Sequence, residues 1–281
     1  FSSWSAIRAI RAERASEEIV SFLQEDILLQ ATPEREPDRD IKLRTVLDRA
    51  SQKIDAPFNE QPLLEASVRR TLGEAYEALG ELESAHDHFE MAAELYAKNL
   101  GADSTLTLEL NSELVGLLQQ QSSYQRAIDL GTAVLDKQLS LLGPDHPSTL
   151  RTMVRLGRAH RLMADYERAE EIHRAAYTAF RRILGVEHPE TLDAMHSLAA
   201  TNIYQGRFRE AQSLLTEVCE VSRRVLGGEH PASLRALTNL AVAYHGQGQF
   251  SSARLLRIDL LDIHRRVFGP NHPETLVAMH N

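Results

Sequence analysis

The feature that most constrains the fold is a nine-residue phrase that returns every 42 residues. It has the form Leu/Phe-Gly-x-x-His-Pro-x-Ser/Thr-Leu, and its four copies span residues 142–150, 184–192, 226–234 and 268–276. An earlier stretch, 100–108, keeps the phase but lacks the His-Pro step. A unit that recurs at a fixed interval buries its apolar side against the units before and after it, so the copies stack in one direction. The sequence therefore predicts a repeat protein.

Three further columns of equivalent positions follow the same period. The first column is aromatic: Tyr124, Tyr166, Phe208 and Phe250. The second is alanine: Ala85, Ala127, Ala169, Ala211 and Ala253. The third is leucine: Leu72, Leu114, Leu156, Leu198 and Leu240. Together the columns give five full repeats from about residue 60 to 269, and a sixth that begins at 270 and ends within its first helix.

Each repeat reads as two helices. Proline suits the first turn of a helix, because its missing N–H has no partner there in any case. Apolar residues then recur at helical spacing, a turn follows near Gly206 or Gly248, and the second helix ends at a glycine such as Gly227 or Gly269. The alanine column lets the two helices of one hairpin approach closely. We therefore predict an all-α fold, a right-handed α-solenoid of helix-turn-helix repeats over residues 60–281.

Composition excludes several other classes of protein. The net charge of −9 argues against non-specific binding of nucleic acid, which needs a basic surface. The single cysteine, Cys219, allows no disulfide within the chain and no cysteine-based zinc site, and we expect a packed, inert thiol. No apolar run of about 18 residues is present, so we expect no membrane span in this sequence.

The histidines do not predict a metal site. Four of them lie one repeat apart in the recurring phrase, and we expect each to open a helix: His146, His188, His230 and His272. His86 and His88 are two residues apart, so they do not face each other on a helix, and we expect both at the surface. His160 and His173 lie across one hairpin without further donors. No nucleophile triad, phosphate-binding glycine loop or paired-carboxylate motif stands out, so we expect no catalysis and no cofactor.

The 42-residue unit resembles the tetratricopeptide repeat, in the variety found in kinesin light chains and in many bacterial multidomain proteins. The resemblance rests on the recurring phrase and on two following motifs, Asn239-Leu240-Ala241 and Gly248-Gln249-Phe250, and it covers about three quarters of the chain. It implies a non-catalytic surface that binds a protein or peptide in a concave groove lined by the first helix of each repeat.

In that family the groove positions lie five and two residues before the leucine column, and two, five and six after it. In the third repeat these positions, with their neighbour Arg155, give four arginines: Arg151, Arg155, Arg158 and Arg161. The first three follow i, i+4, i+7 and share one helix face. Guanidinium groups bind carboxylates in bidentate fashion, so we expect a peptide ligand with an acidic segment. The alternative is that the arginines pair with acids of adjacent repeats, such as Glu113 or Asp193.

The neighbouring repeats supply the rest of the predicted groove. These residues are Glu109, Gln119, Asp193, His196, Tyr204, Arg235, Thr238 and His245.

Residues 1–59 lie outside the period. They predict a helix over about 5–30, a charged loop with two prolines over 31–39, and a second helix over about 40–54. One reading of this segment is a cap that covers the exposed apolar edge of the first repeat.

The same segment resembles the region that follows the transmembrane helix of bacterial receptor-type serine/threonine kinases. The residues that carry the resemblance are 11–15 (Arg-Ala-Glu-Arg-Ala), 22–28 (Phe-Leu-Gln-Glu-Asp-Ile-Leu) and 46–50 (Val-Leu-Asp-Arg-Ala). It implies a sensor region on the extracytoplasmic side, with a membrane span and a kinase domain upstream. The alternatives are a soluble, cytoplasmic adaptor like kinesin light chain and, ranked last, an enzyme on a helical scaffold.

The ends of the sequence suggest a fragment, because it starts at Phe1 rather than methionine and stops abruptly. We expect the apolar side of Leu276 and Met279 to be uncovered. The oligomeric state and the partner's identity are not predicted.

Overall fold

The computed structural model describes residues 43–54, 61–270 and 273–280. The helix and loop expected over 5–39, the kinase-like residues 11–15 and 22–28, and His272 lie outside the described residues.

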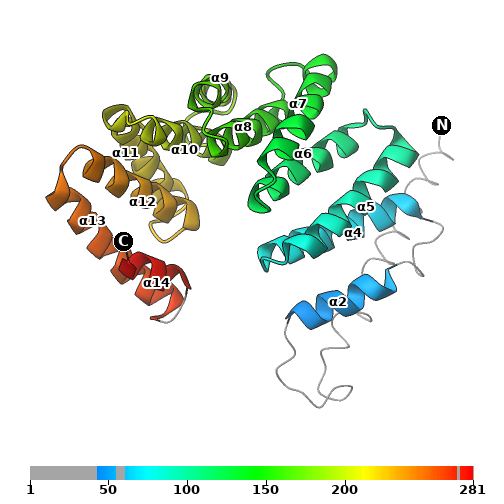
Figure 1. Cartoon of the computed structure of the whole chain (residues 1–281), viewed down its shortest axis with the longest axis horizontal. Coiled ribbons are helices and arrows are strands. Elements are labelled where there is room, and N and C mark those ends of the chain that lie inside the picture. The colour runs from blue at the N-terminus through cyan, green and yellow to red at the C-terminus, as the bar shows by residue number, and fades with distance from the viewer. Residues whose placement is uncertain (1–42, 55–60, 271–272, 281) are drawn as a thin grey trace, which may run out of the picture. The chain divides into compact units, whose positions relative to one another are not determined.

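The described residues fold into helices joined by short turns, which confirms the all-α prediction (Figure 1). The helices are α2 (Leu43–Lys53), α4 (Pro62–Ala78), α5 (Leu82–Leu100), α6 (Thr105–Gln120), α7 (Tyr124–Leu141), α8 (Pro147–Leu162), α9 (Tyr166–Leu184), α10 (Pro189–Tyr204), α11 (Phe208–Val225), α12 (Pro231–Gly246), α13 (Phe250–Phe268) and α14 (Pro273–His280).

The chain divides into two compact units at the Ser123–Tyr124 boundary. In the first unit α4 packs on α5, and α5 on α6, with α2 against α4. In the second unit each helix from α7 to α14 packs on the next one along the chain. Within this unit α10 also contacts α8 and α12, so the first helices of neighbouring repeats lie side by side.

The repeated histidines open helices, as the sequence predicts. His146, His188 and His230 are the N-cap residues of α8, α10 and α12, and each is followed by proline. In all three, imidazole Nδ1 accepts a hydrogen bond of 3.2 Å from the backbone N–H two residues later. In the second repeat, which lacks His-Pro, Ser104 Oγ instead accepts from Thr107 N at 3.2 Å. The cap is therefore retained where its residue type changes.

The turn between the two helices requires a left-handed residue in every repeat. Gly206 and Gly248 adopt φ of 74° and 75° there. Ala164 and Ser122 hold the equivalent positions of their repeats with φ of 62° and 58°. A side chain is disfavoured in this region. The turn nevertheless keeps the same conformation where alanine or serine replaces glycine, so the backbone follows the period even there.

The alanine and leucine columns form the core. Every alanine of its column is at most 2% exposed, and every leucine of its column at most 7%. In the first and third repeats a glycine on the first helix faces a ring on the second. A Cβ on Gly157 would lie 2.6 Å from the His173 ring, and one on Gly73 would lie 2.6 Å from Phe89.

His173 is a satisfied core residue. It is fully buried, with Nδ1 3.0 Å from Thr201 Oγ1 and Nε2 3.2 Å from the Val154 carbonyl. Burial lowers the pKa of His173 to about 3, so its ring is neutral near pH 7. His160 bonds instead to Asp165, at 2.9 Å, and the two histidines do not form a ligand pair. Among the residues that the structure describes, no group of three or more His, Cys, Asp or Glu side chains could hold a metal ion.

His88 corrects a prediction, because it is buried rather than at the surface. It is 5% exposed, its ring stacks on Tyr76 at 5.4 Å, and its Nε2 lies 2.9 Å from Ser51 Oγ. Burial, and to a smaller extent the charge of the nearby Arg69, lowers the pKa of His88 to about 4. The i, i+2 spacing tells only that His86 and His88 do not share a face. His86 is half-buried, with Nε2 3.1 Å from Glu90.

Helix α2 keeps the repeat register, although the sequence pattern gave no sign of it. Its buried residues Val46, Leu47 and Ala50, with Ile54 just after the helix, stand 42 residues before four buried residues of α5: His88, Phe89, Ala92 and Tyr96. Arg44 also pairs with Glu81 at 2.6 Å, a separation of 37 residues that recurs between repeats farther along the chain. Helix α2 therefore packs as the second helix of a preceding repeat would.

Two further expectations agree with the structure. Burial raises the pKa of the Cys219 thiol to about 12, which disfavours the reactive thiolate. On α14, Leu276 and Met279 are 52% and 44% exposed. None of the described helices has the length and apolar character that crossing a bilayer requires.

We expect the histidine cap to contribute measurably to stability. His188→Ala should lower the free energy of unfolding by about 1 kcal/mol, because the backbone N–H of Glu190 loses its acceptor. His188→Asn should retain most of the stability, since asparagine is a strong cap. Urea unfolding followed by circular dichroism measures both, and equal losses in the two variants would contradict the capping role.

We expect His173→Phe to reduce the acid sensitivity of the fold. Imidazole in the unfolded chain titrates near pH 6.5, whereas His173 in the fold titrates near 3. The stability it contributes is therefore full above pH 6.5 and is lost as the pH falls towards 3, because only the unfolded state binds the proton in this window. The loss between pH 6.5 and pH 5 amounts to about 2 kcal/mol.

The first repeat supplies the model for this variant, because Phe89 packs against Gly73 as His173 does against Gly157. The variant should match the wild type at pH 7 and exceed it at pH 5 in urea unfolding. A variant that loses as much stability as the wild type between the two pH values would refute the assignment.

Candidate peptide-binding surface

The predicted groove residues of the second unit lie on three neighbouring first helices, α8, α10 and α12. We call their solvent-facing side the first-helix surface; in Figure 1 these helices run from green to orange. Helix α10 contacts both α8 and α12, so these first helices lie side by side. Polar side chains on this surface therefore reach from one repeat to the next.

Arg151 and Arg158 bridge α8 and α10. Arg151 donates to Glu190 Oε1 at 3.1 Å and to Ser148 Oγ at 3.0 Å. Arg158 donates from Nε to Ser197 Oγ at 3.1 Å and pairs through Nη2 with Asp193. The pairing with Asp193 is the alternative that the sequence left open. Both side chains are nevertheless about one third exposed, at 37% for Arg151 and 33% for Arg158.

Arg161 and Tyr204 form an aromatic edge on the same surface. The Arg161 guanidinium carbon lies 5.0 Å from the centre of the Tyr204 ring, and Tyr204 stacks on Tyr166 at 5.8 Å. Burial lowers the pKa of Arg161, although a guanidinium keeps its charge in proteins. Tyr204 remains 58% exposed, so the edge offers a ring face to solvent.

The first-helix surface carries a surplus of positive charge between α8 and α10. Helix α8 has four arginines and no acid, whereas α10 has two acids, Glu190 and Asp193, and neither arginine nor lysine. Arg155, the fourth arginine, is half-buried and takes part in polar contacts of its own.

Helices α10 and α12 are joined by His196 and Asn239. The Asn239 amide nitrogen lies 2.9 Å from His196 Nε2. Burial lowers the pKa of His196 to about 4, so it acts as a neutral hydrogen-bonding group near pH 7. Arg235 and Thr238 are exposed beside this pair. His245, at the end of α12, packs edge-on against Phe250 at 5.1 Å.

The predicted groove residues of the first unit are Glu109 and Gln119, both half-buried on α6. Cross-helix pairing occurs in this unit too. Arg70 on α4 donates to Glu113 on α6 at 2.5 Å, and Gln120 on α6 donates to Glu77 on α4.

Sequence reasoning missed three residues of the surface: Glu190, Ser197 and Asn239. Glu190 follows the helix-opening proline, and Ser197 and Asn239 flank the leucine column, so each belongs to the repeat pattern. The signal that could have found them is their offset from the predicted residues, because side chains 39 or 43 residues apart meet across neighbouring first helices.

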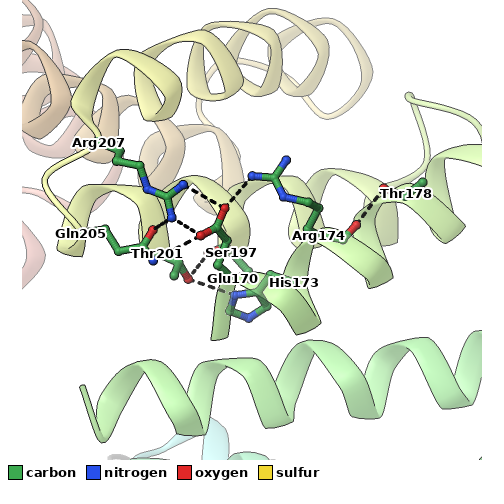
Figure 2. Close-up of polar contacts among 8 residues, drawn as sticks. All are labelled: Glu170, His173, Arg174, Thr178, Ser197, Thr201, Gln205 and Arg207. Atoms are coloured by element: carbon green, nitrogen blue, oxygen red, sulfur yellow. Dashed lines mark hydrogen bonds and ion pairs between the residues drawn. The ribbon is translucent and has the colours of Figure 1, made fainter. Parts of the chain in front are cut away.

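A charged network joins α9 of the third repeat to the turn between α10 and α11 of the fourth (Figure 2). The carboxylate of Glu170 on α9 accepts hydrogen bonds from Arg174 at 2.7 Å and from Gln205 at 3.2 Å. It also accepts from both Nη atoms of Arg207, one of them at 3.0 Å. Burial by itself raises the pKa of Glu170, but the bonds from Arg207, Arg174 and Gln205 outweigh it and lower the pKa to about 2. Because Gln205 and Arg207 follow α10, the network also holds α10 in place.

Comparison with known proteins agrees with this geometry. Models of the tetratricopeptide repeat match residues 66–105, 104–182, 160–224 and 194–257. The chain therefore belongs to the tetratricopeptide repeat family. No curated protein matches it in sequence.

Solved structures share the fold. The chain is similar to a kinesin-light-chain protein of Podosopora anserina whose TPR-like repeats are nearly identical to one another. The identity is 28% and the TM-score 0.59, over 74% of this chain and 98% of that one. It is also similar to BtubC from P. vanneervenii, at 17% identity and a TM-score of 0.65, over 83% and 95% of the two chains. The Rap protein complexed with competence and sporulation factor gives 11% identity and a TM-score of 0.67, over 94% and 73%.

We expect Glu170→Gln to lower the free energy of unfolding by about 2 kcal/mol at pH 7, because charged hydrogen bonds to two arginines are weakened. The depressed pKa means that this contribution is full above about pH 4.5 and is lost as the pH falls towards 2. Urea unfolding at pH 7 and pH 3 measures both effects.

The matched control is Glu171→Gln, since Glu171 is 67% exposed and pairs only with the exposed Arg168 among the contacts that the structure gives it. The control should change stability by less than about 0.5 kcal/mol. Equal effects at positions 170 and 171 would show that the network does not hold the repeats together.

Proposed function

We propose that the first-helix surface binds an extended peptide of a partner protein, with an acidic segment of that peptide over Arg151, Arg155, Arg158 and Arg161. Helical repeats of this family are typical scaffolds for protein–protein interaction. The observation that carries the finer proposal is the charge surplus, four arginines on α8 against two acids on α10.

Pairing does not remove these arginines as binding groups. A guanidinium has five N–H donors, and Ser197 and Asp193 use only some of those on Arg158. The acids instead hold the side chains in one conformation, so a ligand meets donors that are already ordered. The exposed ring of Tyr204 at the end of the row offers an apolar contact beside the charges.

The proposed biological setting is the sensor region of a bacterial transmembrane serine/threonine kinase. It is supported by residues 11–15, 22–28 and 46–50, which resemble the segment between a membrane span and the repeats in such kinases. In this setting the repeats are extracytoplasmic, and the catalytic domain lies upstream.

A second candidate is a soluble adaptor, favoured by the 28% identity to kinesin-light-chain-type repeats. The two settings differ in what the encoded protein carries before Phe1. A kinase catalytic domain followed by an apolar segment of about 20 residues supports the first, and a polar linker supports the second.

Selection from a random 12-residue peptide library on the purified chain tests the binding proposal. We expect the enriched peptides to contain Asp or Glu, and the triple variant Arg151→Gln, Arg155→Gln, Arg158→Gln to weaken their binding at least tenfold, because each lost charged contact is worth about 1 kcal/mol or more. Affinity is measured by fluorescence anisotropy at two salt concentrations.

The matched control removes the same charge from exposed arginines of the second helices, with Arg168→Gln, Arg182→Gln and Arg224→Gln. Circular dichroism should show the same helicity in all three proteins. Equal weakening by the control, or enriched peptides without acidic residues, would overturn the proposal.

A further inference from the structure

Helix α2 is held to the first repeat by polar contacts that involve buried side chains. Ser51 Oγ on α2 lies 2.9 Å from Nε2 of His88 on α5, and the Tyr76 hydroxyl on α4 donates to Asp48 Oδ1 on α2 at 2.9 Å. Tyr76 and His88 are 2% and 5% exposed, and their rings stack on each other. Hydrogen bonds to two buried rings therefore join α2 to both helices of the first repeat.

The other repeats hold different residue types at the two positions that meet in the Ser51–His88 contact. The column of His88 continues with Leu130, Ile172, Leu214 and Leu256, and the column of Ser51 continues with Ala93, Leu135, Tyr177, Cys219 and Leu261. Stacking of repeats needs side chains that fill the space between helices. It does not need an imidazole and a hydroxyl at this place, so the pair is a departure from the period that is confined to the contact with α2.

The interface of α2 is also incompletely packed. A hollow of about 310 Å³ lies among α2, α4 and α5, and Ser51 and His88 both line it. Asp48, Arg69 and Asp87 add charged groups to its wall, and Asp87 is exposed, so the hollow opens to solvent. Side chains that border a gap lose dispersion contacts on that side. Helix α2 is therefore held less firmly than a helix with a filled interface.

The surroundings of His88 keep its ring neutral while α2 is docked. The ionisable side chains near the ring, among the residues that the structure describes, are Asp48 on α2, Arg69 and Tyr76 on α4, and Asp87 on α5 itself. Arg69 is in turn paired with Glu65 at 2.6 Å. Burial and the charge of Arg69 outweigh the opposite effect of Asp87 and lower the pKa of His88 to about 4. An imidazole in water has a pKa near 6.5.

We propose that α2 is an acid-releasable helix, docked on the first repeat at neutral pH and released when His88 takes up a proton. The docked state binds this proton more weakly than the released state. Docking is therefore complete above about pH 6.5 and is lost as the pH falls towards 4. Release uncovers the rings of Tyr76 and His88, so the first repeat offers a partner a surface in acidic surroundings that it hides at neutral pH.

Hydrogen exchange of backbone amides in the full chain, followed by mass spectrometry, tests the proposal. Protection factors, which correct for the pH dependence of intrinsic exchange, report how often a helix opens. We expect the protection of α2 to fall about twentyfold between pH 7 and pH 5, as the two pKa values require. The protection of α4 and α5 should change little, because these helices stay paired when α2 leaves.

A double variant, Ser51→Ala with His88→Leu, gives this contact the residues that follow one period later, Ala93 and Leu130. It should keep α2 equally protected at both pH values. The matched control is His86→Leu, which removes a histidine of the same helix whose ring is bonded to Glu90. This control should retain the full fall, and circular dichroism should show the same helicity in all three proteins.

Four outcomes would overturn the proposal. They are equal protection of α2 at the two pH values in the wild type, an α2 that is already unprotected at pH 7, the same fall in the double variant, and loss of protection in α4 and α5 together with α2. The last outcome means that the first repeat unfolds as a whole and that α2 is not released from it.

Discussion

The contact between one repeat and the next is the interaction on which the rest of this structure depends. Each helix buries one apolar face, and only its neighbours along the chain can cover it. Small residues such as Ala169 and Gly157 set how closely the helices approach, and buried rings such as His173 fill the space that glycine leaves. The same close stacking brings the first helices side by side, so the core determines which polar groups meet on the first-helix surface.

The polar contacts between repeats have their own regularity. Glu170 and Arg207 meet 37 residues apart, and Arg44 and Glu81 meet at the same separation with the charges exchanged. The exchange shows that the position requires complementary charges and does not specify which side carries the acid. In stacked repeats each unit contacts mainly its neighbours, so such pairs stabilise a defined spacing between neighbouring repeats.

The periodic part of the fold could be predicted from sequence, because stacking demands the same residue size at the same place in every repeat. The His-Pro step that begins α10 at His188 recurs with the same period, so its role could be predicted too. The burial of His88 also follows from the period, since Leu130, Ile172 and Leu214 hold the same column, whereas its local spacing from His86 does not indicate it. The sequence leaves open whether Arg158 pairs with Asp193 or with a ligand. The pairing depends on side-chain reach across two helices, which a pattern along one helix does not contain.

Arg158 and Val242 occupy the same position in different repeats, and the comparison shows where this array varies. At Arg158 the neighbouring helix supplies Asp193 and Ser197, so the arginine links two repeats. At Val242 the same position carries an apolar side chain that is 36% exposed. The backbone needs neither arrangement, since both repeats begin with the same His-Pro cap and bury the same leucine. Residues freed from the demands of stacking are therefore the ones that selection for a partner can change.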